Sequence, residues 1–143
     1  MNKIIAVDEK NQIAWAKLCN KLWVENTHEI YINWRKNGLF KYEFLYERDG
    51  MAIAFLSLSV RHDYVEGTQS SPVGYIEGIY VENEFRKQGI ARELIEFAKQ
   101  WSKRKGCTEL ASACEIENIN SRKFHSAAGF TEAGVIVHFT MKI

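Results

Sequence analysis

A glycine-bearing loop between an apolar strand and a long amphipathic helix has the residue types to bind an anion. β-Branched and aromatic residues at 75–81 predict the strand, and the apolar spacing at 91–105 predicts the helix. This order points free backbone N–H groups and the positive end of a helix dipole at one place. Gly89 lets an anion such as a phosphate approach the backbone, and Arg86 and Lys87 add positive charge.

The same segment also suits an ordinary connection between a strand and a helix. The sequence has neither G-x-x-x-x-G-K-[ST] nor G-x-G-x-x-G, so the two familiar phosphate loops are excluded. The loop at 86–91 reads R-x-x-G-x-A instead. The rest of the chain must therefore decide between an anion site and a simple connection.

The composition predicts a single globular domain over residues 1–143. Hydrophobic residues make up 46% of the chain, which is enough to bury a core and excludes a disordered chain. The formal net charge is only +1, and basic residues are mixed with acids, so we expect no nucleic-acid partner. The chain has no apolar run of membrane-spanning length and no signal-peptide pattern, so we expect a cytoplasmic protein without a membrane partner.

The cysteines indicate neither a metal site nor a disulfide framework. Cys19, Cys107 and Cys114 are widely spaced, and no C-x-x-C pattern occurs. We expect them to be small buried apolar residues. Cys114 as a nucleophile is the alternative, but the sequence shows no base that would activate it.

The remaining elements predict an α/β (α+β) fold. Apolar periodicity and turn residues place a strand at 4–7, helices at 12–23 and 27–37, strands at 42–48 and 51–61, a polar loop at 62–72, a strand at 107–113, a short helix at 118–128 and a last strand at 133–142. Because a helix separates strands 75–81 and 107–113, these two should be parallel, with a right-handed crossover. We therefore expect a mixed sheet with one parallel pair at its middle.

This order of elements resembles the GNAT acetyltransferase superfamily over nearly the whole chain. The loop at 86–91 is similar to the acetyl-CoA pyrophosphate loop of that family, and E-N-x-x-S-x-x-x-H-x-x-x-G-F at 117–130 resembles its second CoA-binding motif. Residues 64–81, Leu22-Trp23 and 107–112 are similar to the bacterial aminoglycoside 6′-N-acetyltransferases. The resemblance implies a twisted mixed sheet with a central splayed parallel pair.

The resemblance also implies an activity. The enzyme would transfer acetyl directly from acetyl-CoA to the 6′-amine of an aminoglycoside in a ternary complex, and it would confer antibiotic resistance as a homodimer. The alternatives are a GNAT enzyme for another small amine, a polyamine or a protein amine, and a non-catalytic module that binds acetyl-CoA.

The acetyl-CoA contacts follow from the resemblance residue by residue. The pyrophosphate would lie on the backbone of 88–91, and the pantetheine arm would pair with the strand at 79–81. A backbone N–H of that strand would stabilise the oxyanion. The implied contacts are Ile79, Tyr80, Val81, Arg86, Lys87, Gln88, Gly89, Ile90, Ala91, Asn118 and Ser121.

Two residues are candidates for proton transfer. With a period of two, Glu77 would share a strand face with Tyr75, Ile79 and Val81, where a carboxylate needs a partner or a function. It would form a buried salt bridge, or it would orient the substrate ammonium and take its proton. His125 matches the position where many GNAT enzymes have the tyrosine that protonates the CoA sulfur; the alternative is a helix-face histidine without a role.

The acidic residues suit a polycationic amine. Together they could line a negative groove that steers such a substrate, although acidic stretches are usually only solvated. The groove candidates are Glu25, Glu29, Asp63, Glu66, Glu77, Glu109, Glu115 and Glu117. The expected substrate contacts are Trp23, Glu25, Tyr64, Glu66, Glu77 and Glu115.

One position departs from the family pattern. The chain has Ala113 where the aminoglycoside enzymes usually have an Asp after Ala-Ser. Glu115 would point to the same side and partly replace that carboxylate if the strand extends so far.

Overall fold

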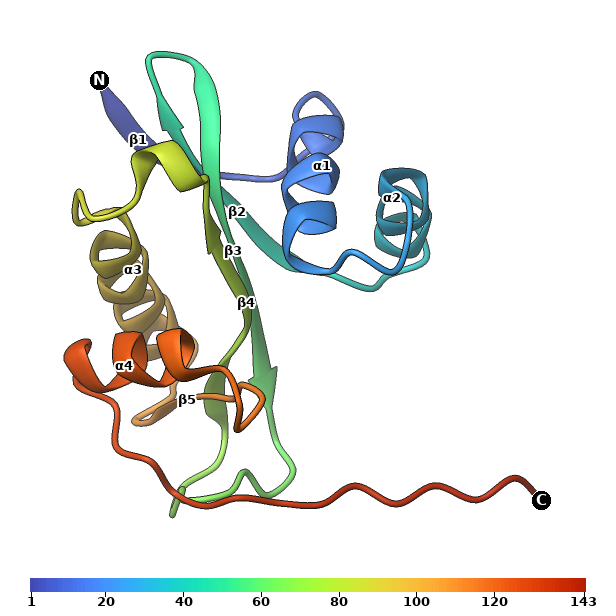
Figure 1. The fold of residues 1–143 in the computed structure, drawn as a ribbon, viewed down its shortest axis with the longest axis vertical. Coiled ribbons are helices and arrows are strands. Elements are labelled where there is room, and N and C mark those ends of the chain that lie inside the picture. The colour runs from blue at the N-terminus through green and yellow to red at the C-terminus, as the bar shows by residue number, and fades with distance from the viewer.

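The computed structural model describes residues 1–143 as a β-sheet with helices on both faces (Figure 1). The elements are β1 (Asn2–Ala6), α1 (Gln12–Leu22), α2 (His28–Lys36), β2 (Tyr42–Arg48), β3 (Met51–Arg61), β4 (Val73–Val81), a 3₁₀ turn (Asn83–Phe85), α3 (Ile90–Arg104), β5 (Leu110–Ser112) and α4 (Ile119–Ala127). This order confirms the predicted fold class. None of the helices is both long enough and apolar enough to cross a membrane.

The sheet is mixed, with the strand order β1-β2-β3-β4-β5. Each of the first three strands pairs antiparallel with the next, while β4 and β5 are parallel. The hairpin between β2 and β3 turns at Asp49 and Gly50, whose φ angles of 51° and 81° suit a two-residue turn with both central residues left-handed. The predicted bounds of β2 and β3 are confirmed.

Two apolar clusters lie on opposite faces of the sheet. One packs α3 against the sheet through residues such as Leu56, Ile76 and Leu94, and the other packs α1 and α2 through Trp15, Leu45 and related residues. Figure 1 shows α1 and α2 on one side of the strands and α3 with α4 on the other. The central strand β3 therefore has two buried faces, which explains its nearly continuous apolar sequence.

A bulge between β3 and β4 changes the expected orientation of Glu77. Ser57 pairs with Gly78, whereas Leu58 pairs with Ile76, so Glu77 is an extra residue on β4. Ile79 and Val81 pack toward α3, while Glu77 is exposed. The expectation of a carboxylate buried among apolar neighbours was therefore wrong, because the bulge breaks the period of two at this residue.

The parallel pair is short and lies at the edge of the single chain's sheet. Only three residues of β4 (73–81) pair with β5, from Gly74 opposite Leu110 to Ile76 opposite Ser112. Beyond Ile76, β4 continues without this neighbour, which is the separation that the resemblance implied. Strand β5 ends earlier than expected, so Glu115 does not share a strand face with position 113.

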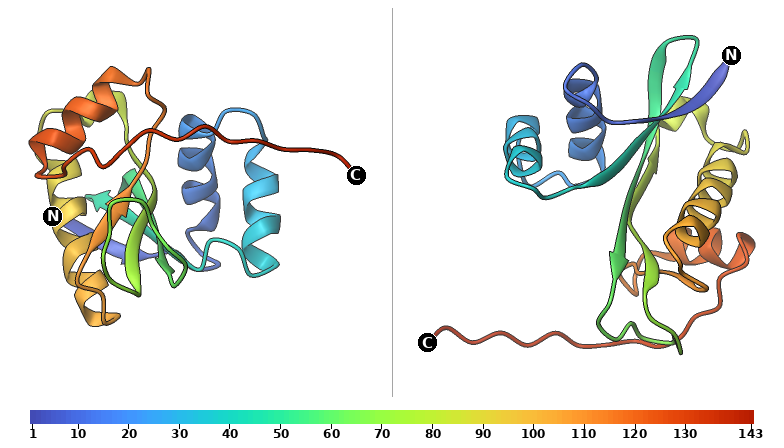
Figure 2. Two further views of the ribbon diagram at one scale, coloured as in Figure 1. Left: turned by 90° about the horizontal axis from the view of Figure 1, so that it is seen from below. Right: turned by 180° about the vertical axis from the view of Figure 1, so that it is seen from behind.

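The predicted last strand over 133–142 does not form in the single chain. This C-terminal tail is exposed throughout and extends away from the other elements, toward the side of the sheet on which α1 and α2 lie (Figures 1 and 2). Val135, Val137 and Phe139 alternate as predicted but are 69%, 75% and 89% exposed. The sequence pattern is that of a strand, but in the single chain the tail pairs with no other strand.

Glu43 on β2 is a carboxyl inside the cluster under α1. Its side chain is 3% exposed. Burial raises its pKa from 4.5 to about 8, with a smaller rise from the charge of Glu77, although hydrogen bonds from Ser57 and Trp15 oppose the shift. The folded protein therefore holds a proton on Glu43 at pH values where the unfolded chain has lost it.

This proton makes stability depend on pH. The pKa of Glu43 is higher in the folded state, so its contribution is complete below about pH 4.5 and is lost as the pH rises to about 8. The free energy of unfolding should fall across this range by up to about 1.4 kcal/mol per pH unit. Glu43→Gln removes this dependence, so thermal unfolding should show the variant gaining stability over the native chain from pH 5 to pH 8. A constant difference across this range would contradict the assignment.

Candidate active site

The start of α3 presents a row of backbone N–H groups. Gly89 is the N-cap residue, with a left-handed φ of 85°, and no side chain caps the helix. The N–H groups from Gln88 to Arg92 donate to no acceptor within the chain. Together with the helix dipole they supply the donors that the predicted anion site would need.

The side chains of the loop leave this backbone accessible. The Arg86 guanidinium turns back, with Nε donating to the carbonyl oxygen of Val81 at 2.9 Å. The Gln88 side chain accepts from Arg48 Nη1 at 2.8 Å. Ile90 is buried in the core, and Lys87 is exposed, with a left-handed φ of 62°. The loop therefore offers mainly backbone donors, with Lys87 as the free cation beside them.

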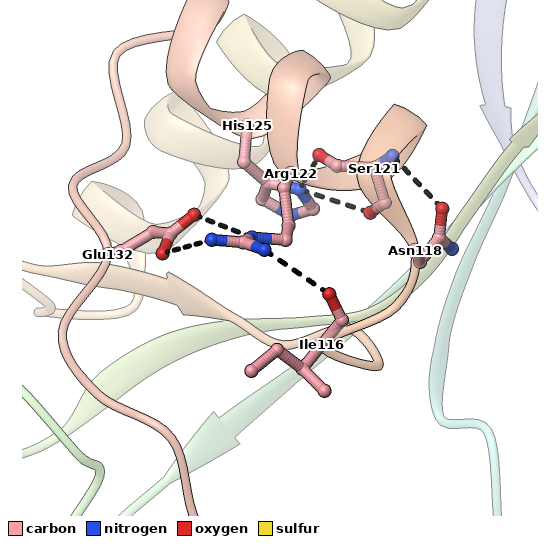
Figure 3. Close-up of polar contacts among 6 residues, drawn as sticks. All are labelled: Ile116, Asn118, Ser121, Arg122, His125 and Glu132. Carbon is pink, nitrogen blue, oxygen red and sulfur yellow. Dashed lines mark hydrogen bonds and ion pairs between the residues drawn. The ribbon is translucent and has the colours of Figure 1, made fainter.

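The N-terminus of α4 (119–127) borders the other side of the gap beyond β5. Asn118 caps this helix by accepting from the backbone N–H of Ser121 at 3.1 Å, as Figure 3 shows. Arg122 holds Glu132 with two hydrogen bonds of 2.9 and 3.1 Å and donates to the carbonyl oxygen of Ile116 at 3.3 Å. These contacts fix the ends of the turn and the helix that follow β5.

His125 connects α4 to the end of β5. Its Nδ1 lies 2.7 Å from the carbonyl oxygen of Ser121, which only accepts, so Nδ1 carries a hydrogen. Its Nε2 lies 2.9 Å from Ser112 Oγ. A neutral ring therefore accepts the Ser112 hydroxyl hydrogen at Nε2, and both ring nitrogens have a partner.

Glu77 lies in a polar cluster on the sheet face toward α1. Arg61 Nη2 donates to both carboxylate oxygens, at 3.0 and 2.9 Å, and Ser59 Oγ donates to Oε2 at 2.5 Å. The Arg61 guanidinium also stacks on the Tyr75 ring, 3.4 Å from its centroid. The carboxylate is therefore held in one orientation on the surface, by an ion pair that is partly exposed.

Trp23 forms an apolar wall next to this cluster. It follows α1, and its ring packs against Phe55 and Phe40 with centroids 5.5 and 5.9 Å away. A side chain at Gly78 would lie 2.5 Å from the Trp23 ring, so only glycine permits this approach. The indole therefore reaches the strand at the residue after Glu77.

The other expected substrate contacts are more dispersed. Glu25 and Glu115 are exposed, and Tyr64 is 75% exposed in the loop at 62–72. Glu66 lies in the same loop, beside the start of the tail at Gly134. The structure does not bring these residues together in the single chain.

Glu109, one of the acids expected to line the groove, is hydrogen-bonded to the loop at 62–72. The Glu109 carboxylate accepts from Ser70 Oγ and, at 2.9 Å, from the backbone N–H of Gln69. These hydrogen bonds lower the pKa of Glu109, with that from Ser70 the largest cause. Glu109 therefore fastens the long loop to the sheet edge.

Sequence reasoning missed the partners of the two candidate catalytic residues. Ser59 and Arg61 lie two residues apart on β3, so their common face could have been found from the strand period. Ser112 lies in the segment that resembles the aminoglycoside enzymes, but its contact with His125 depends on how α4 packs. No local signal in the sequence indicated the contact of Ser112 with His125.

Comparison with known proteins identifies the class. Residues 6–130 match the Acetyltransferase (GNAT) family, and the chain belongs to that family. This confirms the resemblance carried by the loop at 86–91 and the motif at 117–130.

The similar proteins are more specific. An aminoglycoside N(6′)-acetyltransferase type 1 from Acinetobacter haemolyticus is 39% identical over 131 residues, which cover 90% of each chain. Another from Serratia marcescens is 36% identical over 140 residues, covering 95% of this chain and 96% of that one. The structure of AAC(6')-Iy in complex with the bisubstrate analogue CoA-S-monomethyl-acetylneamine superposes with a TM-score of 0.93 at 34% identity, covering 100% of this chain and 99% of that chain.

Proposed function

We propose that this protein is an acetyl-CoA-dependent aminoglycoside 6′-N-acetyltransferase. The observation that carries the proposal is the position of Glu77 on β4, between the gap beside β5 and the wall formed by Trp23. The same strand leads to the free N–H groups at the start of α3. An anionic cofactor and a cationic amine would thus meet along one strand.

The residues present fit acetyl-CoA, which supplies the acetyl thioester. The N–H groups from Gln88 to Arg92 would bind the pyrophosphate, with Lys87 beside them. The strand at 79–81, free of β5, would pair with the pantetheine arm and donate an N–H to the acetyl carbonyl. Asn118 and Ser121 would contact the same arm from α4.

Glu77 is proposed to bind and deprotonate the amine. Its carboxylate would pair with the substrate ammonium and accept the proton, directly or through water, so that the neutral amine can attack the thioester. The contacts from Ser59 and Arg61 support this role because they fix the carboxylate before substrate binds.

His125 is proposed to supply the proton to the departing CoA thiolate. A protonated His125 would donate from Nε2 to Ser112 Oγ while the Ser112 hydroxyl passes its own hydrogen to the sulfur. The 2.9 Å contact between these two side chains supports this route.

The substrate end is proposed to select a polycation. Trp23 would cover an apolar sugar face, while Glu25, Tyr64, Glu66 and Glu115 would contact hydroxyl and amino groups. At position 113 this chain has an alanine, where the aminoglycoside enzymes usually have an aspartate. This departure motivates the second candidate, acetyl transfer to another small amine or polyamine.

A panel assay of CoA thiol release tests the proposal. Kanamycin and tobramycin should exceed spermidine and a lysine-containing peptide in kcat/KM, because only the aminoglycosides present several ammonium groups on rigid rings. A preference for spermidine or the peptide would favour the second candidate. Acetyl-CoA binding by calorimetry without thiol release from any amine would favour a non-catalytic module.

Glu77→Gln tests the role of the carboxylate. The variant keeps the shape but accepts no proton, so kcat/KM for the best amine should fall on the order of 100-fold or more. The Kd for CoA should stay the same. Glu96→Gln, on the exposed face of α3, is the matched control and should retain activity. Unchanged kcat/KM in Glu77→Gln would remove this residue from the mechanism.

The chain is also proposed to be a cytoplasmic homodimer that acts on small molecules, not on nucleic acid or membranes. The C-terminal tail supports the dimer, because its alternating apolar side chains have no partner in the single chain. The edge strand β5 of a second copy has unpaired backbone groups with which an extended tail could pair.

Substitutions in the tail test the dimer. Both faces of the tail are exposed in the single chain, so neither change should unfold it. Val137→Lys with Phe139→Lys should convert a dimer of about 33 kDa, twice 16.6 kDa, to a monomer in light scattering. The control, His138→Lys with Thr140→Lys, should remain a dimer. A monomeric native protein, or dimers in both variants, would contradict this role for the tail.

A further inference from the structure

Arg48, at the end of β2, joins three segments around the loop that precedes α3, and none of the steps proposed above uses it. Its Nη1 donates to Gln88 Oε1 at 2.8 Å, and its Nε donates to Asn2 Oδ1 at 3.1 Å. Its Cζ lies 5.6 Å from the centroid of the Phe85 ring. The guanidinium is therefore held between β1, the 3₁₀ turn and the loop, which lie at the same end of the sheet in Figure 1.

The loop has few other contacts that could fix its shape. Residues 87 and 88 form no backbone hydrogen bond. Lys87 has a left-handed φ of 62°, a conformation that is costly for a residue with a side chain. Among residues 87–89, the one side-chain hydrogen bond is that between Gln88 and Arg48. The conformation of this part of the loop therefore depends on a contact with a different strand.

Tyr46 contacts the other end of the same segment. It lies two residues before Arg48 on β2, so both side chains leave the strand on the face toward α3. The Tyr46 hydroxyl donates to Glu93 Oε2 at 2.6 Å, in the first turn of α3. Burial, together with this contact, raises the pKa of the Tyr46 phenol, so the hydroxyl keeps its hydrogen. Strand β2 thus contacts both ends of the row of free N–H groups at 88–92.

We propose that Arg48 is a positioning residue for acetyl-CoA: through Gln88 it holds the loop in the conformation whose N–H groups bind the pyrophosphate, while Tyr46 holds the helix that follows. This inference rests on the proposed binding of acetyl-CoA at the start of α3. Donors that are already in place bind an anion without a further loss of loop entropy, so the contribution of Arg48 lies in the affinity for the cofactor. None of its contacts reaches the proposed amine end at Glu77.

Calorimetry with CoA tests this role without any amine. Arg48→Met keeps an apolar stem beside Phe85 but removes the donors, so the Kd for CoA should rise about five- to tenfold, as expected for the loss of one hydrogen bond from a charged group. Lys103→Met is the matched control, because it removes the same charge in the last turn of α3. Its Kd should stay within twofold of the native value. A Kd for Arg48→Met within that same range would overturn the proposal.

A double-mutant cycle separates positioning through Gln88 from simple attraction between Arg48 and the anion. Gln88→Ala keeps the backbone N–H groups but removes the acceptor for Arg48, so it should raise the Kd for CoA about as much as Arg48→Met does. The double variant should bind CoA no more weakly than either single variant, because both remove the same contact. Losses that multiply in the double variant would show that Arg48 acts independently of Gln88, and would overturn the proposal.

A shorter acetyl donor separates this role from general damage to the fold. S-Acetylpantetheine lacks the pyrophosphate, so Arg48→Met should lower kcat/KM for acetyl-CoA about five- to tenfold but leave kcat/KM for S-acetylpantetheine and KM for the amine within about twofold. Equal losses with both donors would overturn the proposal. A native protein that binds no CoA would overturn the proposed function as well, whereas native CoA binding with an unaffected Arg48→Met variant would remove only the role of Arg48.

Discussion

The brief pairing of β4 (73–81) with β5 (110–112) opens the gap in which we propose that the substrates bind. Two parallel strands that stayed paired would satisfy each other's backbone groups and leave no space between them. Here the pairing ends at Ile76 and Ser112, and β4 continues alone toward the turn that precedes α3. The gap between the two strands is thus bordered by the unpaired backbone of β4 on one side and by α4 on the other. The N-terminus of α3 lies at one end of it.

The place where we propose that the amine binds depends on a second irregularity, the bulge at Glu77. Without it, this carboxylate would point into the apolar cluster under α3, where ionisation would be costly. With it, the carboxylate reaches the surface and meets Ser59 and Arg61. Glu43 is buried beneath this point and contacts Ser57, the residue at which the strand pairing shifts.

The sequence predicted most of the fold because its signals were local. The Asp49-Gly50 turn, the apolar strands and the glycine before α3 each specify their own structure, and the motif at 117–130 placed α4. The orientation of Glu77 could not be predicted, since a bulge depends on how two strands align. The tail at 133–142 has the pattern of a strand, but it extends away from the sheet and pairs with no strand of its own chain. The contact of His125 with Ser112 likewise depends on packing between distant segments.

Amide hydrogen exchange with and without CoA tests the central claim most directly. If CoA lies along the separated strand, its addition should slow exchange both in the segment 78–82 of β4 and in the segment 88–92 at the start of α3. The antiparallel pairs of β1 with β2 should be unaffected. Saturating CoA that slows exchange at α3 alone, or at neither segment, would contradict the role assigned to the gap between β4 and β5.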